Sequence, residues 1–143
     1  MSHVSFSELK IWNECPYKHK LKYIDRVNAF EGNEYTAFGT AIHSACEHGI
    51  VDDTIDMQAH FEKAFLQEIQ KLPTKVKDSL EQHTIDQMMN QGRELALQAI
   101  PTLKEYFGND VEVLSVEERL NESVNIPDRY NFKGFVDLVI KSG

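Results

Sequence analysis

Long hydrophobic runs are missing from the 143-residue sequence, because no stretch reaches the ~18 consecutive apolar residues that a membrane-spanning helix needs. The first ten residues contain no apolar segment like the central region of a secretory signal. Cysteine is scarce too: Cys15 and Cys46 are too few to form the disulfide framework of a small secreted domain. We therefore expect a cytoplasmic protein that does not associate with a membrane.

Several motifs that carry chemistry are also absent. The sequence has no glycine-rich phosphate loop, no Gly-x-Ser-x-Gly nucleophile elbow and no dinucleotide-binding fingerprint. The spacing from Cys15 to Cys46 is not that of a zinc site. These absences argue against the enzyme classes and zinc modules that depend on such motifs.

Basic residues are outnumbered, with 15 Lys+Arg against 23 Asp+Glu and a formal net charge of −8. Residues 1–26 differ from the rest, because five basic and three acidic side chains give this segment +2 and leave −10 for the remainder. Such a segment is either a local anion site or a solvated helix face. Hydrophobic residues at 41% and charged residues at 27% are ordinary for a globular chain, so the length predicts one domain.

The first two-thirds of the chain has the periodicity of helices. Ser5 and Ser7 can each cap a first helix, and Phe6, Leu9 and Trp12 recur at the spacing of its buried stripe. These residues predict an amphipathic helix that packs through its aromatic side.

Proline and glycine divide the rest of the helical part. Pro16 predicts the opening of a second short helix, and residues 28–35 predict a loop. Further helices are expected at about 37–51, 54–72 and 74–107. In the last of these, Pro101 predicts a kink or break near Gln98.

The period changes at Gly108. Strands are expected at about 111–124 and 131–140, joined by a turn at Pro127 and Asp128, as a β-hairpin or meander. The second strand is almost continuously apolar, which is typical of a strand covered on both faces. Because two strands would leave an open edge, we expect the sequence to be the front part of a longer domain.

Five acidic or imidazole side chains are candidates for carrying chemistry. His43 and Glu47 share one helix face, where the pair is either a metal or general-base site or an ordinary surface pair. Asp137 lies inside the apolar strand, so it is either paired within the protein or bound to a cation. Gly134 ahead of it indicates a bulge or a close approach to another group. Alternation leaves open whether Glu117 or Glu118 faces inward.

Taken in order, these pieces resemble the RecB-like branch of the PD-(D/E)XK nuclease superfamily. The start, Ser5 to Tyr23, is similar to the pattern S-x-S-x-L…C-P-x-[KR]…Y. Gly39 to Glu47 is similar to G-T-x-x-H-x-x-x-E, Val116-Glu117 to the strand that carries a glutamate, and Gly134 to Asp137 to G-x-x-D.

The resemblance implies a fold and a reaction. The fold would be α/β, and α+β within this sequence: helices over residues 1–108, then at 109–143 the first strands of a restriction-endonuclease-like mixed sheet. The reaction would be metal-dependent hydrolysis of DNA, by an exonuclease or endonuclease of recombination, repair or phage DNA processing. The partners would be DNA and a helicase or recombination protein.

The resemblance also implies roles for individual residues. His43 and Asp137 would bind Mg²⁺ or Mn²⁺, and Glu117 would support the site as a third catalytic residue. Glu47 would orient His43 from behind. The DNA backbone would contact three further side chains: Tyr17, Lys18 and Lys22.

One defining element of the superfamily is not found after Asp137. The acidic-x-Lys strand that supplies a second carboxylate and a lysine has no counterpart in residues 138–143, so we expect the chain alone to be inactive or weakly active. In some relatives a cysteine placed like Cys15 joins three cysteines beyond the core around an iron–sulfur cluster. Those three positions would follow residue 143, so a cluster through Cys15 stays an open alternative.

Two alternatives remain open at this point. In one, His43 and Asp137 are structural and the lysine face binds nucleic acid or a protein without catalysis. In the other, the chain is a small helical protein that dimerises through its open strand edge.

Overall fold

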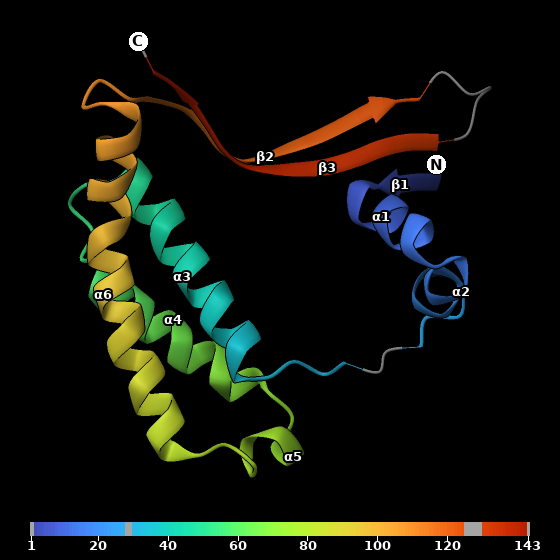
Figure 1. The fold of residues 1–143 in the computed structure, drawn as a ribbon, viewed down its shortest axis with the longest axis horizontal. Coiled ribbons are helices and arrows are strands. Elements are labelled where there is room, and N and C mark those ends of the chain that lie inside the picture. The colour runs from blue at the N-terminus through green and yellow to red at the C-terminus, as the bar shows by residue number, and fades with distance from the viewer. Residues whose placement is uncertain (1, 28–29, 125–129, 143) are drawn as a thin grey trace. The chain divides into compact units, whose positions relative to one another are not determined.

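The computed structural model describes residues 2–27, 30–124 and 130–142 (Figure 1). A short strand opens the chain, helices follow it, and two long strands complete a three-stranded sheet, so the expected α+β class is confirmed. Contacts divide the chain into two compact units, one of residues 1–30 and 117–137 and the other of residues 31–116 and 138–143. No helix among the described residues is both long and apolar enough to cross a membrane.

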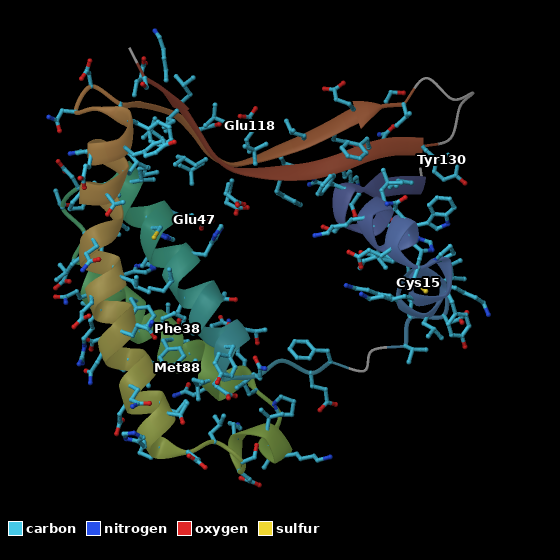
Figure 2. The ribbon with its side chains drawn as sticks, in the orientation of Figure 1. Cys15, Phe38, Glu47, Met88, Glu118 and Tyr130 are labelled. Carbon is cyan, nitrogen blue, oxygen red and sulfur yellow. The ribbon has the colours of Figure 1, made fainter. Side chains whose placement is uncertain are left out.

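The second unit is built around α3 (Glu34–Val51), α4 (Met57–Lys71) and α6 (Gln82–Phe107). On α3 the buried face consists of small residues four positions apart, which lets the neighbouring helices approach closely. Those residues are Ala37, Ala41, Ala45 and Gly49. Phe61 and Phe65 of α4 fill the resulting space at 0% exposure, with Phe38 and Met88 against them (Figure 2).

Side-chain caps fix where these helices begin. Asn33 accepts a hydrogen bond from the Thr36 backbone N–H at 3.0 Å, and the Thr36 hydroxyl accepts one from the Asn33 N–H at 2.9 Å. This reciprocal capping box satisfies two backbone donors at the start of α3. Asp56 caps α4 by accepting from the Ala59 N–H at 3.0 Å.

The expected helix of residues 74–107 is interrupted elsewhere than predicted. A single turn, α5 (Thr74–Lys77), precedes α6, and α6 then runs unbroken through Pro101. Of the predicted kink or break near Gln98, the break is wrong, because the helix is continuous there. Proline removes only one backbone hydrogen bond, and the helix keeps its buried stripe of Met88, Gly92 and Ala96 against α3 and α4.

The first unit starts with a strand that the sequence did not predict. β1 (Ser2–Ser5) is too short to show alternation, and it pairs in parallel with residues 130–133 of β3 (Tyr130–Lys141). β2 (Glu112–Ser123) lies on the other side of β3, which confirms the predicted pairing of the two long strands. The predicted turn at Pro127 and Asp128 lies outside the described residues.

Three helical pieces follow β1: α1 (Phe6–Glu14), α2 (Pro16–His19) and a π-helical turn, η1 (Lys20–Ile24). Ser5 caps α1 by accepting from the Glu8 N–H at 3.1 Å, and Pro16 opens α2 as predicted. The predicted buried stripe of α1 is wrong, because its three members are exposed. Phe6 is 66% exposed, Leu9 47% and Trp12 54%. The spacing identifies the helix but does not show what covers it.

Candidate metal centre

His43 lies on the outer face of α3. Ala41 and Ala45 on either side of it are buried against α4 and α6, so the helix geometry turns His43 away from that core and exposes its side chain. Its Nε2 contacts the Glu47 carboxylate one turn later. A carboxylate on one ring nitrogen holds the imidazole in a fixed orientation and tautomer, as in many metal-binding histidines.

Glu117 interrupts the regular geometry of β2. Its φ of 52° lies in the left-handed region, which few residues other than glycine adopt. Alternation also slips there, because Ser115 and Val116 are both half-buried and Glu117 and Glu118 are both exposed. These features are typical of a β-bulge, which re-aims a side chain at the bulged position. Alternation could not choose between the two glutamates for this reason.

Asp137 lies on β3 between the half-buried residues Val136 and Leu138, and its own side chain is exposed. The carboxylate of Asp137 is therefore not buried, and its predicted pairing or cation binding stays a prediction. A Cβ placed on Gly134 would meet no described atom within 4 Å, so the predicted close approach is not made within the described chain. The irregular backbone lies in the neighbouring strand, at Glu117.

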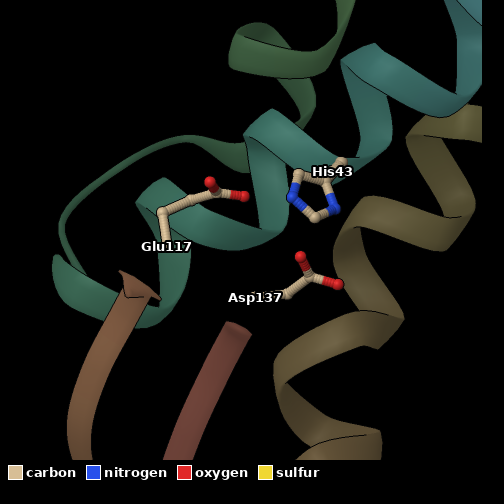
Figure 3. A group of neighbouring side chains, drawn as sticks. All are labelled: His43, Glu117 and Asp137. Atoms are coloured by element: carbon tan, nitrogen blue, oxygen red, sulfur yellow. The ribbon is translucent and has the colours of Figure 1, made fainter. Parts of the chain in front are cut away.

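His43, Glu117 and Asp137 come together (Figure 3). Each offers one ligand atom, and these three atoms all lie within 4.8 Å of one another. Among the described residues this is the one group of three or more such side chains that could hold a metal ion. All three members belong to the set predicted from the sequence.

The group fits a divalent cation by its chemistry and its size. Two atoms on opposite sides of one ion are about 4.2 Å apart for Mg²⁺ and about 4.8 Å for Ca²⁺. The two carboxylates are donors that Mg²⁺ and Mn²⁺ both prefer, and the imidazole shifts the preference toward Mn²⁺. The two carboxylates repel each other at this distance, and a cation between them would remove that repulsion. Because all three side chains are exposed, water or a substrate can complete the coordination.

A comparison of the sequence with models of known protein families identifies the family of this chain. The family model of the PD-(D/E)XK nuclease superfamily matches residues 3–143. The chain belongs to the PD-(D/E)XK nuclease superfamily. No curated protein and no solved structure gives a significant match. Membership makes the protein a nuclease in general and agrees with a divalent metal at the acidic group.

Other residues predicted for this nuclease lie on exposed helical surface. Tyr17 on α2 is 67% exposed, Lys18 contacts the Glu14 carboxylate at 3.4 Å, and Lys22 lies 5.6 Å from the centroid of the Tyr23 ring. These contacts leave the aromatic face and the ammonium groups accessible to solvent. Their role in binding DNA stays a prediction.

The two cysteines differ in environment. Cys15 is exposed, whereas Cys46 of α3 is half-buried. Burial and the neighbouring Glu47 carboxylate raise the pKa of the Cys46 thiol, which keeps it protonated and unreactive.

One cluster beside the site was not predicted. The Ser44 hydroxyl lies 3.0 Å from Nε2 of His60, and the His60 ring lies on His48 with 4.5 Å between centroids. His48 donates from Nδ1 to the Ser44 carbonyl oxygen at 2.8 Å. The pairing joins α3 to α4 across 16 positions, so no local sequence pattern could have indicated it.

Proposed function

We propose that this superfamily member is a DNA nuclease of the RecB-like type whose divalent ion, Mg²⁺ or Mn²⁺, is held by His43, Glu117 and Asp137. The supporting observation is the convergence of one imidazole and two carboxylates to within 4.8 Å. The order of short motifs along the chain supports the assignment to the RecB-like type. The association with recombination, repair or phage DNA processing, and with a helicase, is part of the same proposal.

The protein's own groups have separate tasks in this mechanism. His43, Glu117 and Asp137 fix the position of the ion, and Glu47 holds the His43 ring in orientation. When bound, the ion supplies positive charge to the phosphodiester transition state and lowers the pKa of water. The backbone bend at Glu117 would aim its carboxylate at the ion.

We propose that the DNA backbone contacts α2 and η1. Lys18 and Lys22 would neutralise phosphates, and the exposed ring of Tyr17 would stack on a base. Since residues 138–143 contain no acidic-x-Lys, we expect the 143-residue polypeptide to bind the ion while cleaving DNA weakly or not at all. Binding is therefore the appropriate first measurement.

The test is a calorimetric titration with Mn²⁺ of the unmodified chain and of single variants. We expect His43→Ala and Asp137→Asn to weaken Mn²⁺ binding by at least about tenfold, since each removes a ligand. Glu47→Gln should weaken it less, because it changes only the orientation of the ring. The matched control is Glu118→Gln, which removes an adjacent exposed carboxylate outside the group and should leave the affinity unchanged.

Two results would contradict the proposal. One is an unmodified chain that does not bind Mn²⁺. The other is binding that Glu118→Gln weakens as much as Asp137→Asn does, because it would then reflect the general acidity of the chain.

The DNA surface has its own test. Anisotropy of a fluorescent DNA oligonucleotide should show weaker binding by Lys18→Gln/Lys22→Gln, with a shallower dependence on salt. Lys75→Gln/Lys77→Gln, on α5, is the control of equal charge change. Equal weakening by both pairs would show that the surface of α2 and η1 has no special role.

A further inference from the structure

The helices among the described residues contain three glycines, and two of these are explained by packing. A Cβ on Gly92 of α6 would stand 1.9 Å from Cζ of Phe61. A Cβ on Gly49 of α3 would stand 2.5 Å from Sδ of Met57. At both positions a side chain of α4 occupies the place of the missing methyl group, so a larger residue cannot fit without movement.

Gly39 of α3 has no such explanation. A Cβ there would meet no described atom within 4 Å, and the residue is exposed. Its φ is not in the left-handed region, so its conformation does not require glycine. Glycine inside a helix nevertheless lowers stability relative to alanine, because it has more conformational freedom to lose. Neither the packing nor the backbone of α3 compensates for that loss.

The position of Gly39 relates it to the candidate metal centre. It precedes His43 by four residues and so lies one turn before it on the same face of α3. The open space at Gly39 therefore lies one helical turn before His43, on the same side of α3.

We propose that Gly39 keeps this turn of α3 bare so that the sugar–phosphate backbone of the DNA substrate can lie directly on the helix beside His43. Glycine is the residue that lets a protein backbone approach a ligand most closely. The inference rests on the proposed nuclease function and adds a substrate-contact position to it. Gly39 is then retained for substrate binding and lowers the stability of the helix.

The test separates stability from binding, because a purely structural role would change both in the same direction. In Gly39→Ala we expect the thermal midpoint to rise by about 3 °C. We also expect the affinity for a fluorescent DNA oligonucleotide in the presence of Mn²⁺ to fall about threefold. In Gly39→Leu the larger side chain should lower it by about tenfold, or one decade in Kd. The calorimetric affinity for Mn²⁺ alone should not change in either variant.

The control is Thr102→Ala, an exposed position of α6, which should also raise the midpoint but leave DNA binding unchanged. Unaltered oligonucleotide affinity in Gly39→Leu would overturn the inference, as would a lower midpoint in Gly39→Ala. An unmodified chain that binds Mn²⁺ but no oligonucleotide would overturn it while leaving the metal site standing. Absence of Mn²⁺ binding would refute the proposed function and this inference together.

Discussion

The helices of the two units look alike in sequence but differ in what covers them. In α1 and in α4, aromatic and aliphatic side chains recur every three or four residues. Phe61 and Phe65 of α4 are fully buried, whereas Phe6 and Trp12 of α1 are more than half exposed. Hydrophobic periodicity thus identifies a helix and its apolar side, but the burial of that side depends on a partner that the periodicity does not name.

The largest difference in stability between the two units is expected when one large side chain is removed from each. Phe61→Ala should lower the free energy of unfolding by about 3–5 kcal/mol, because it leaves a cavity at the centre of α3, α4 and α6. Trp12→Ala, the counterpart on α1, should change it by no more than about 0.5 kcal/mol. Urea unfolding followed by circular dichroism measures both. Comparable losses would mean that α1 is covered as well as α4 is.

A smaller effect is expected from adding one methyl group in each unit. Gly92→Ala should cost about 1–3 kcal/mol, since the new Cβ overlaps the Phe61 ring. Gly134→Ala in β3 should be nearly neutral, because no described atom lies within 4 Å of its Cβ position. Thermal melts distinguish the two. In Phe61→Leu, which has a smaller side chain at the overlap, Gly92→Ala should cost less stability than in the unmodified chain. If the two changes are strictly additive, the overlap with the Phe61 ring does not cause the loss in Gly92→Ala.

Removing a helix cap should cost about 1 kcal/mol of stability, and the two units should differ in how far that loss extends. Asn33→Ala removes one half of the capping box of α3 and should lower the stability of the whole three-helix unit. Ser5→Ala removes the cap of α1 and should affect only that helix. Hydrogen exchange of backbone amides can separate the two results. Faster exchange confined to α1 in Ser5→Ala would agree with the comparison, and faster exchange throughout α3, α4 and α6 would contradict it.

The smallest expected effect is a dependence on pH of the stability of the unit that contains α3, α4 and α6. Burial, then the neighbouring His48 and Lys63, lower the pKa of His60 below its ordinary value. The unfolded chain therefore binds the proton more readily. The contribution of His60 is fully present above about pH 6.5 and is lost as the pH falls. Thermal midpoints between pH 8 and 5 should fall less in His60→Gln than in the unmodified chain. His83→Gln is the control, and an identical profile in His60→Gln would refute the prediction.

Much of the fold could be predicted because its signals are local. The caps, the prolines, and the change of period at Gly108 located most elements within a few residues. Other features depend on contacts between distant residues. β1 is a strand only because residues 130–133 pair with it. The continuity of α6 through Pro101 depends on its packing against α3 and α4.

The candidate site shows the same division. The resemblance of the short motifs to the nuclease superfamily implied His43, Glu117 and Asp137, whereas the residue pattern alone left Glu117 and Glu118 undecided. The left-handed backbone of Glu117 could not be predicted, because glutamate rarely adopts it and no neighbouring glycine indicates it. Which glutamate joins the group is decided by that backbone conformation.

The capping box of α3 also determines the direction in which the His43 side chain projects from the helix. Asn33 and Thr36 define the first residue of the helix, and each residue after it turns the face by about 100°. One residue inserted between Thr36 and His43 would rotate the imidazole about a quarter of a turn away from the two carboxylates, whereas an insertion before Asn33 would leave its angle unchanged. Length variation in this part of the chain is therefore permissible only on one side of the cap, and Mn²⁺ affinity would report the difference.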